Sequence, residues 1–351
     1  MLEKKHTFNK RKSVLFRTST IITVNENSIE KINLDEYKLE QKIGKTNLAS
    51  VYICRHIKTN KIYTMKIMKK IDVLHSKLVE RLTNEFKIMA NVYHPFIIEL
   101  KGINNTNPYT LNFLFEFIPG GTLNSLIKSH KRLPIANARF YLASLVTVID
   151  YLHKRNIIYR DLNPENILIN SNGFIKLADF SFAKKLENIS DITYSMCGSP
   201  EYYSPEMVNK TGYNISTDFW GLGIMLYEML VGCTPFYDND PMKIYQKITK
   251  SKALYPKFMD MNAKILIKHL LIVDPNKRLG CSKKGIIEII ESSFFEGFDW
   301  KGLLYRSIKP PFIPVVNGPT DTSNFKKIDD FIEDENDNVE IEKAKDPFYK
   351  W

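Results

Sequence analysis

The spacing of apolar residues changes once along the chain, at the turn Pro119-Gly120-Gly121. Before this turn lie short runs rich in Val, Ile and Tyr, which are typical of β-strands. The expected strands are residues 37–43, 51–56, 61–68, 97–102 and 110–117, with one helical pattern at 78–92. After the turn, apolar residues recur at helical spacing, most clearly over 136–154 and 217–230, and continue to about residue 290. The sequence therefore predicts an α+β fold, a small β-rich lobe followed by a larger, mainly helical lobe.

The composition is that of an ordinary globular protein. The chain has 351 residues, 44% of them apolar and 25% charged, enough for about two domain-sized units. Its four cysteines lie far apart and form no Cys-x-x-Cys pair. This argues against a zinc site or a disulfide framework and favours a reducing compartment. We expect a cytoplasmic protein, and a nuclear location stays open.

The net charge of +11 indicates a partner or ligand that is acidic. Nucleic acid, an anionic membrane, phosphate ligands and acidic proteins are the general alternatives. The charge is uneven, because residues 329–351 hold nine acidic and three basic residues and so carry −6. The longest apolar stretch, 219–231, is too short to span a bilayer and contains Glu228. Leu2 stands where N-myristoylation requires glycine, so neither a membrane span nor that anchor is expected.

A set of short motifs follows the chain in a fixed order. They are Tyr63-Thr64-Met65-Lys66, then Glu85, Tyr159-Arg160-Asp161-Leu162-Asn163-Pro164-Glu165-Asn166, Asp179-Phe180-Ser181 and Ser204-Pro205-Glu206. The set resembles the protein-kinase signature. Three further stretches resemble the AGC group, and most of all the cAMP-dependent kinase catalytic subunits. They are Tyr159 before Arg-Asp, Cys197-Gly198-Ser199-Pro200-Glu201-Tyr202 and the late stretch Gly318-Pro319-Thr320-Asp321-Thr322-Ser323-Asn324-Phe325.

The resemblance implies a bilobal protein-kinase fold with an AGC-type C-terminal tail. On this basis we expect a basic N-terminal arm over 1–36, a kinase domain over 37–295 and the tail over 296–351. The domain would divide into an N-lobe at about 37–118 and a C-lobe at about 119–295. The tail would wrap the small lobe, and its end, Phe348-x-x-Trp351, resembles a hydrophobic motif that docks in a groove there.

The resemblance also assigns the chemistry of phosphoryl transfer, in which catalysis is mainly positioning and charge stabilisation. Lys66 would neutralise phosphate oxygens of ATP while paired with Glu85. Asn166 and Asp179 would bind Mg²⁺, a hard cation that prefers oxygen ligands. Asp161 would accept the proton of the incoming Ser or Thr hydroxyl. Any one of these residue types alone is more often a solvated surface residue, and it is their common order and spacing that carries the prediction.

The implied nucleotide site lies between the lobes. Phe115 would be the gatekeeper. The predicted contacts to the nucleotide are Ile43, Gly44, Lys45, Thr46, Asn47, Leu48, Ala49, Ser50, Val51, Lys66, Glu85, Glu116, Ile118, Leu168 and Phe325. Apolar members of this set would also satisfy plain core packing.

Regulation and substrate choice follow from the same resemblance. Ser195 matches the activation-loop phosphosite, and its phosphate would pair with Arg81, Arg160 and Lys184. Glu165 and Glu228 match carboxylates that read an arginine two positions before the target hydroxyl, and Ser199 matches a hydroxyl associated with Ser/Thr specificity. Thr122 stands in place of an acidic residue that helps to read a second arginine, so the preference for basic peptides should be weaker.

The partners expected are basic protein substrates and no nucleic acid. A cyclic-nucleotide-binding regulatory subunit stays open: Tyr194 replaces a Trp that contacts it, whereas Tyr245 and Trp220 are retained.

Glu340 falls near the usual turn-motif phosphosite of the tail, where it would supply a constant negative charge. Glu206 and Arg278 match a structural ion pair of the large lobe.

Several departures from the family pattern cluster around the phosphates. The glycine loop reads Gly44-x-Thr46-x-x-Ala49-x-Val51 and keeps only its first glycine, although close approach of backbone to phosphate favours glycine. Asn163 replaces a Lys that contacts the γ-phosphate, Ser181 follows Asp179-Phe180 in place of glycine, and Thr64 replaces a small alanine. Two hypotheses follow: a Ser/Thr protein kinase of reduced activity, and a nucleotide-binding pseudokinase or scaffold with little phosphotransfer.

Overall fold

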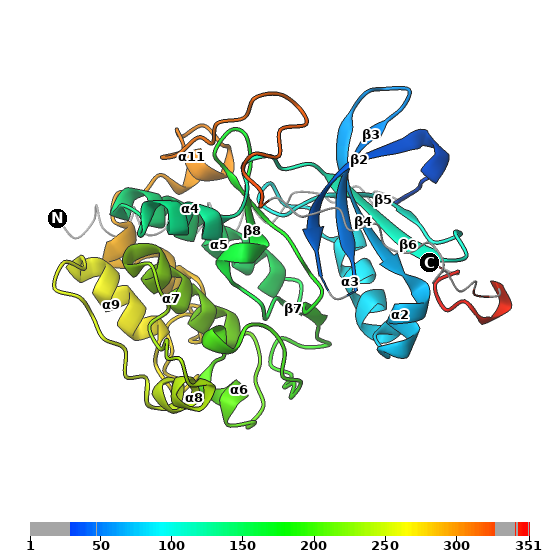
Figure 1. The fold of residues 1–351 in the computed structure, drawn as a ribbon. Coiled ribbons are helices and arrows are strands. Elements are labelled where there is room, and N and C mark those ends of the chain that lie inside the picture. Colours follow the sequence, from blue (N-terminus) through cyan, green and yellow to red (C-terminus); the bar gives the residue numbers. More distant parts are fainter. Residues whose placement is uncertain (1–28, 47, 327–340, 342, 350) are drawn as a thin grey trace.

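Two lobes make up the molecule, a sheet-rich one and a helical one (Figure 1). The computed structural model describes residues 29–46, 48–326, 341, 343–349 and 351. The predicted α+β class and bilobal arrangement are confirmed. Most of the predicted basic arm, residues 1–28, lies outside the described residues, as do Asn47 and Glu340.

The small lobe is built on a six-stranded sheet with the order β1-β5-β6-β4-β3-β2. Its strands are β1 (Glu30–Lys31), β2 (Tyr37–Lys45), β3 (Ser50–His56), β4 (Ile62–Lys69), β5 (Leu100–Asn104) and β6 (Thr110–Glu116). All neighbours pair antiparallel except β1, which runs parallel to β5 and was not predicted. The last residues of the predicted arm are ordered elements of the small lobe. They join the sheet edge and form a short 3₁₀ turn at Leu34–Glu36.

One predicted strand is divided between the two lobes. Residues 97–102 form a single apolar run, but β5 begins only at Leu100. Ile97 instead bridges Leu177 of the large lobe, and the Ile98 N–H donates to the Leu177 carbonyl at 2.9 Å. Hydrophobic periodicity cannot show this division, because both halves are buried against different elements.

Two helices cover the small lobe. The helix predicted over 78–92 is α3 (Val79–Asn91), and its buried face carries Leu82, Glu85, Ile88 and Met89. The short helix α2 (Lys70–His75) before it was not predicted. It begins at a fully buried lysine, Lys70, one of whose partners, Asp346, comes from the far end of the chain.

The large lobe is organised around two helices that are buried on nearly all sides, α5 (Ile135–His153) and α7 (Ser216–Val231). A helix that is apolar all round belongs in a core, as their sequences indicated. Gly223 of α7 lets helix α9 (Met261–Leu270) come close, since a Cβ there would lie 2.9 Å from Leu270 and Leu271 side-chain atoms. In the part of the chain that the structure describes, no helix is long and apolar enough to cross a membrane.

The remaining elements of the large lobe are shorter. The helices are α4 (Leu123–His130), α6 (Pro205–Val208), α8 (Pro241–Lys250), α9 (Met261–Leu270), α10 (Ile287–Ile290) and α11 (Trp300–Leu304). The strands are β7 (Ile157–Ile158), β8 (Ile167–Ile169), β9 (Ile175–Leu177) and β10 (Lys184–Lys185). Strands β8 and β9 form a small hairpin facing the small lobe, and β7 pairs with β10.

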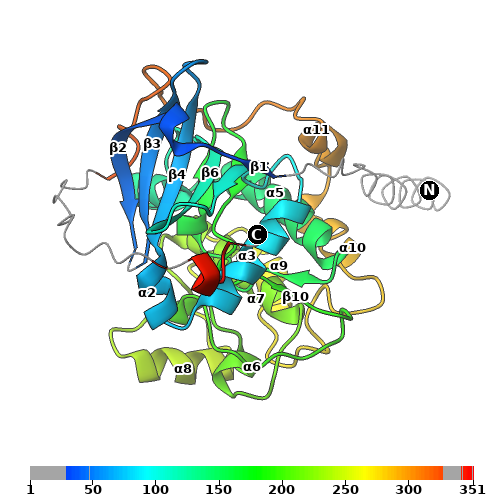
Figure 2. The same ribbon diagram turned by 90° about the vertical axis from the view of Figure 1, so that its right-hand side faces the viewer.

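The C-terminus docks on the small lobe, as the hydrophobic motif predicted (Figure 2). Phe348 is fully buried, and the Trp351 ring stacks on Phe86 of α3 with centroids 5.2 Å apart. The Lys70 ammonium donates to the Asp346 carboxylate at 2.5 Å and to two backbone carbonyls, so a buried cation fixes the same segment. Apolar burial and this ion pair together attach the tail to α2 and α3.

Removing the anchor of this segment should loosen the whole lobe. We expect Phe348→Ala to lower the free energy of unfolding by about 3 kcal/mol, the usual cost of truncating a buried phenylalanine. Leu254→Ala is the matched control, because Leu254 is 82% exposed and exposed truncations usually change stability by less than about 0.5 kcal/mol. Chemical denaturation of both variants measures the difference. Equal stabilities would show that the tail contributes nothing to the fold.

Candidate active site

A cavity of about 300 Å³ opens between the sheet and the β8–β9 hairpin. Of the predicted nucleotide contacts, ten line it: Ile43, Gly44, Thr46, Ala49, Val51, Lys66, Glu85, Ile118, Leu168 and Phe325. Phe115, Thr64 and Asp179 line it as well. Of the other predicted contacts that the structure describes, Lys45, Leu48, Ser50 and Glu116 are not part of the lining. Glu116 sends its carboxylate to the Lys176 ammonium, 2.6 Å away, and to the Glu99 N–H.

An ion pair joins the sheet to α3 at one wall of this cavity. The Lys66 Nζ on β4 lies 2.8 Å from Glu85 Oε1. Burial lowers the pKa of Lys66, but the carboxylates of Glu85 and Asp179 outweigh it and hold that pKa above its ordinary value. Lys66 is therefore charged, and its ammonium faces the cavity where anionic oxygens can reach it.

Asp161 is a buried carboxylate in the loop between β7 and β8, and two asparagine amides hold it. Asn166 Nδ2 donates to one carboxylate oxygen at 2.7 Å and Asn163 Nδ2 to the other at 3.1 Å. Burial raises the pKa of Asp161, while these amide hydrogen bonds act in the opposite direction. The sequence comparison treats Asn163 only as a lost lysine. Its side chain also fixes the orientation of Asp161 and caps the 3₁₀ turn Pro164–Asn166.

Asp179 lines the cavity and has a backbone in the left-handed region, φ +50°. Its Oδ1 accepts the Ser181 N–H at 3.0 Å. Burial raises the pKa of Asp179, but Lys66 and the Ser181 donors outweigh it and leave that pKa below its ordinary value. The carboxylate is therefore anionic and directed into the cleft.

Asp179 and Asn166 are suitable as magnesium ligands on the chemistry of their donors. Among the described residues, no cluster of three or more His, Cys, Asp and Glu side chains could hold a metal alone. Mg²⁺ is commonly held by one or two protein oxygens together with substrate phosphates, so a complete protein cage is not required. The Asn166 amide nitrogen binds Asp161, which leaves its amide oxygen as the ligand atom.

A residue that the sequence analysis missed, Asp218 in the first turn of α7, supports the catalytic loop. It is 1% exposed and accepts the backbone N–H groups of Tyr159 and Arg160 at 3.0 and 2.9 Å. Its third donor is His153 Nε2, 2.7 Å away. Arg160 has φ +71°, a strained conformation for a residue with a side chain. Asp218 stabilises that conformation, which places Asp161. The available signal was an acidic residue in the first turn of a helix that is mostly apolar.

The β2–β3 loop differs from a glycine loop in how its backbone is satisfied. The Thr46 hydroxyl accepts the N–H groups of Ala49 at 3.0 Å and of Leu48 at 3.4 Å. The Thr46 N–H in turn donates to the Ala49 carbonyl at 2.8 Å. Amides that could donate to a phosphate are thus engaged within the loop. The loop is therefore self-contained: the Thr46 hydroxyl satisfies the Leu48 and Ala49 amides within the loop, besides being part of a larger side chain than that of glycine.

The activation segment brings only part of the predicted cation cluster to Ser195. Arg160 Nη1 donates to Ser195 Oγ at 3.1 Å, and Lys184 Nζ donates to Thr193 Oγ1, which lies 3.5 Å from Ser195 Oγ. Arg81 is different: in the described part of the chain, its hydrogen bonds go to Ser181. That Arg81 would pair with a phosphate on Ser195 stays a prediction, and here its guanidinium binds Ser181 instead.

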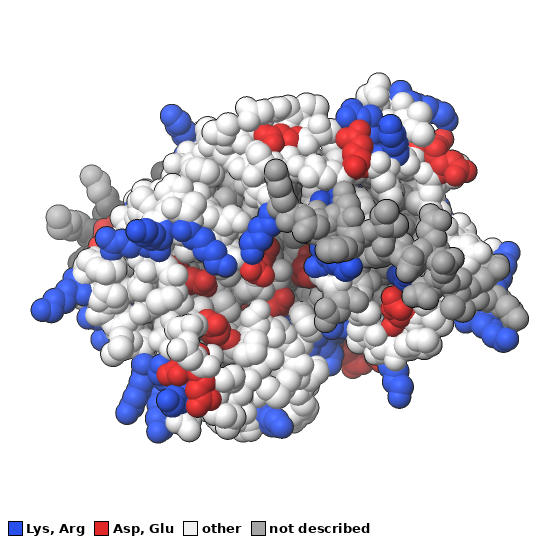
Figure 3. Space-filling view, in the orientation of Figure 1, with Lys and Arg blue, Asp and Glu red and all other residues white. Residues whose placement is uncertain are grey.

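The predicted peptide-reading carboxylates lie on the large-lobe side of the cleft. Glu165 is exposed and accepts a hydrogen bond from Asn124 Nδ2 at 2.8 Å. Glu228 accepts one from the Tyr202 hydroxyl, and burial raises the pKa of Glu228. Ser199 begins the 3₁₀ turn Pro200–Tyr202, and Thr122 caps α4 through its hydroxyl. Figure 3 shows acidic side chains gathered at the middle of this face, between the lobes, with basic ones around them.

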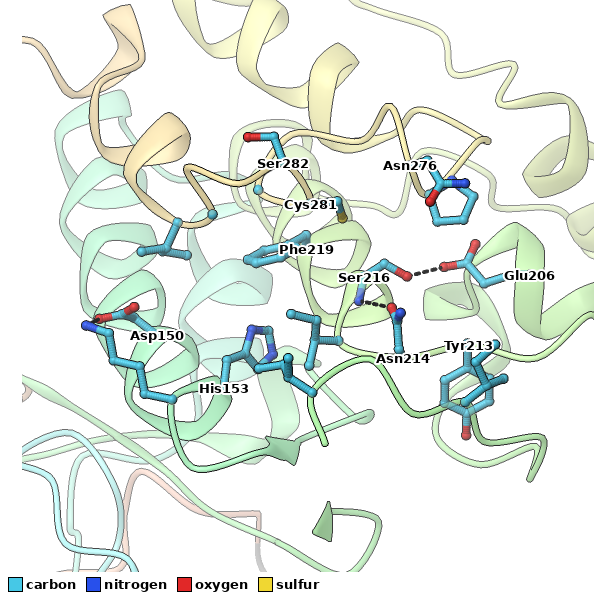
Figure 4. Close-up of a pocket in the computed structure, with 18 of the residues that line it drawn as sticks. Asp150, His153, Glu206, Tyr213, Asn214, Ser216, Phe219, Asn276, Cys281 and Ser282 are labelled. Atoms are coloured by element: carbon cyan, nitrogen blue, oxygen red, sulfur yellow. Dashed lines mark hydrogen bonds and ion pairs between the residues drawn. The ribbon is translucent and has the colours of Figure 1, made fainter. Parts of the chain in front are cut away.

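A larger cavity of about 540 Å³ lies within the helical lobe, away from this cleft (Figure 4). Several of its polar lining groups are paired with one another or with neighbouring residues. Asp150 binds the Lys154 ammonium at 2.7 Å, His153 binds Asp218, and Ser216 Oγ donates to Glu206 at 3.1 Å. These paired groups hold the helical lobe together. The smaller cleft between the lobes brings Lys66, Glu85 and Asp179 to one cavity, so it is the candidate active site.

The ion pair predicted between Glu206 and Arg278 is confirmed. The Arg278 guanidinium contacts both carboxylate oxygens, at 2.6 and 2.8 Å, and is 1% exposed. Burial raises the pKa of Glu206, but Arg278 outweighs it and lowers that pKa overall. The pair ties α6, at the end of the activation segment, to the body of the lobe.

The self-contained loop makes a measurable prediction. Thr46→Gly frees the Leu48 and Ala49 amides to donate to a phosphate, and a hydrogen bond to a charged group stabilises by about 1.5–3 kcal/mol. Added loop entropy offsets about 1 kcal/mol of this, so the dissociation constant for ATP with Mg²⁺ should fall about fivefold. Thr59→Gly, in the exposed β3–β4 turn, is the control for glycine itself. Calorimetric titration decides, and unchanged or weaker binding by Thr46→Gly contradicts this account of the loop.

Comparison with known proteins agrees with this geometry. Residues 37–295 match the family model described as protein kinase domain. The chain is 38% identical to cAMP-dependent protein kinase catalytic subunit 3 of Drosophila melanogaster, over 85% of this chain and 50% of that protein. It is 38% identical to the human catalytic subunit PRKX, over 84% and 81%, and 36% identical to cAMP-dependent protein kinase type 3 of Saccharomyces cerevisiae, over 85% and 74%. The chain thus spans about half the length of the Drosophila relative. On the family model and these relatives, the chain belongs to the protein kinase family, with cAMP-dependent catalytic subunits among its relatives.

Proposed function

We propose that this chain is a Ser/Thr protein kinase that transfers the γ-phosphate of ATP, with Mg²⁺, to protein substrates with arginine before the target residue. The observation that carries the proposal is the geometry of Asp161. Its carboxylate is fixed by Asn163 and Asn166, and it belongs to the loop whose Glu165 lines the same cavity as Lys66 and Asp179. This arrangement suits a base that must receive a hydroxyl next to an anionic ligand.

The chain's own residues divide the work of the reaction. When bound, Mg-ATP supplies the phosphoryl group and the cation that neutralises it. Lys66, held by Glu85, binds phosphate oxygens and orients them. Asn166 and Asp179 would hold the metal, and Asp161 accepts the proton from the substrate hydroxyl at a carboxylate oxygen. Phe325 from the tail packs near Phe117, with centroids 6.2 Å apart, and closes the cleft over the adenine.

Substrate preference rests on the acidic side of the cleft. Glu165 is exposed and Glu228 partly so, and an arginine of a bound peptide can reach both. A guanidinium suits such a pair because its fixed fork of donors matches carboxylate oxygens. With Thr122 in place of an acid, a second arginine has one anionic partner fewer. We therefore expect one dominant arginine in preferred substrates.

Regulation would involve phosphorylation of Ser195 and a surface for a regulatory subunit that includes Tyr194 but not Trp220. A phosphate on Ser195 would meet Arg160 and Lys184 and hold the activation segment. Tyr194 is 64% exposed and available to a cyclic-nucleotide-binding regulatory subunit, whereas Trp220 is fully buried and cannot contact one. Such a subunit and a cytoplasmic location remain part of the proposal.

The alternative is a nucleotide-binding pseudokinase or scaffold. The self-contained Thr46 loop favours weak phosphate binding, and Asn163 removes a cation from the γ-phosphate. Against it stand the retained base, both metal-ligand candidates and the Lys66–Glu85 pair; Lys66, Glu85 and Asp179 line one cavity, and Asn166 binds the base. The groups that are missing tune the reaction, and the groups that are present perform it, so we favour phosphotransfer.

A single assay separates the two functions. Wild-type protein with Mg-ATP and a Ser peptide containing arginine should produce phosphopeptide, and Asp161→Asn should reduce the rate at least about 100-fold, a typical contribution of a general base. Asp35→Asn, in the exposed 3₁₀ turn of the small lobe, is the matched control and should keep the wild-type rate. ATP binding by wild type without transfer above Asp161→Asn would establish the pseudokinase alternative.

The missing lysine gives a second test. Asn163→Lys restores a cation at the γ-phosphate, a charge-assisted bond of about 1.5–3 kcal/mol. The variant loses the cap of the 3₁₀ turn, which costs about 1 kcal/mol, so kcat should rise about tenfold or somewhat less. Asn163→Met has a similar length without the charge and should not exceed wild type. Steady-state kinetics with a peptide substrate measure both, and an unchanged or lower kcat for Asn163→Lys would count against this explanation.

A further inference from the structure

The Arg81 side chain of α3 is held by Ser181, the residue that replaces glycine after Asp179-Phe180. Arg81 Nε donates to the Ser181 carbonyl at 2.7 Å, and Arg81 Nη2 donates to the Ser181 hydroxyl at 3.0 Å. The guanidinium also lies over the Phe182 ring, 3.8 Å from its centroid. Three contacts thus fix one cation against two consecutive residues.

The hydroxyl is the part of this contact that glycine could not supply. Any residue offers the carbonyl, but only a side chain with an acceptor can receive the second arm of the guanidinium. The planar fork of arginine fits two such acceptors at once, which an ammonium does not. Ser181 has no positive φ, so its side chain is accommodated here without backbone strain. The serine is therefore a contact residue as well as a departure from the family pattern.

The contact closes a ring of interactions around the cleft. Arg81 lies one helical turn before Glu85 on α3, so both project from the same side of the helix. Ser181 lies two residues after Asp179 and donates its N–H to the Asp179 carboxylate at 3.0 Å. Lys66 pairs with Glu85 at 2.8 Å and is attracted by Asp179. Helix α3 and the Asp179 segment are thus linked twice, through Lys66 and through Ser181.

We propose that Ser181 is a positioning residue for the phosphotransfer proposed above: with Arg81 it forms a clasp that couples α3, which carries Glu85, to the segment that carries Asp179. The clasp uses neutral acceptors, so it holds without a phosphate on Ser195. Arg160 and Lys184 remain to receive that phosphate. In this chain, the position of α3 is therefore set by Ser181, and phosphorylation acts on the activation segment alone.

The test combines backbone hydrogen exchange with kinetics. Ser181→Ala removes one acceptor, and Arg81→Lys keeps the charge but not the fork. Each should raise amide exchange over residues 79–91 about fivefold or more and lower kcat/KM for ATP about tenfold, the value of one hydrogen bond to a charged group. Ser181→Thr keeps the hydroxyl and should show wild-type amide exchange and a wild-type kcat/KM for ATP. Ser171→Ala, in the exposed β8–β9 turn, should match wild type in both.

Two comparisons make the clasp falsifiable. The double variant Arg81→Lys/Ser181→Ala should be no worse than Arg81→Lys alone, since Arg81→Lys already removes the donor to the Ser181 hydroxyl. The effect of Arg81→Lys should be equally large in a Ser195→Ala background. Additive effects, wild-type exchange in Ser181→Ala, or loss of the Arg81→Lys effect in Ser195→Ala would each overturn the proposal. If wild type transfers no phosphate, the proposed function fails, and the exchange data still decide whether the clasp exists.

Discussion

The buried carboxylate of Asp218 is the group on which the geometry of the cleft depends. It sits at the start of the central helix α7 and accepts three hydrogen bonds, two of them from the backbone of the catalytic loop. An unpaired carboxylate in this position would be costly, so the loop and the helix must stay together. Arg160 takes its strained conformation because Asp218 compensates for it. Asp161 follows Arg160 in sequence, so its position depends on that conformation.

On the phosphate side of the cleft, the departures from the family pattern each carry a local compensation. Thr46 loses the freedom of glycine but satisfies two loop amides. Asn163 loses a cation but orients Asp161 and caps the following turn. Ser181 stiffens a flexible position and gains Arg81. Such compensations preserve the fold and the base while reducing contact with phosphate, which is the pattern expected of a slower kinase rather than of a decayed one.

Much of the fold was predictable from the sequence, because its two lobes differ in hydrophobic period. Helices α3, α5 and α7 begin and end within one residue of the predicted bounds. The unpredicted parts depend on distant partners: Lys70 needs Asp346, β1 needs β5, and Asp218 needs the loop. At the site, motif order was sufficient to bring Lys66, Glu85 and Asp179 to one cavity. It could not show that Arg81 turns to Ser181, since that contact depends on a residue where this chain departs from the family pattern.

Asp218 holds the catalytic loop in its conformation, but it does not line the nucleotide cavity. Its substitution should therefore slow phosphotransfer without weakening ATP binding. Single-turnover phosphotransfer by Asp218→Asn, with enzyme in excess over Mg-ATP and a saturating Ser peptide, tests it directly, with ATP affinity and circular dichroism measured on the same sample. The account predicts that the transfer rate falls at least about tenfold, because each lost charge-assisted hydrogen bond is worth about 1.5–3 kcal/mol, while ATP affinity stays within about twofold. A folded Asp218→Asn protein that transfers phosphate at the wild-type rate would contradict it.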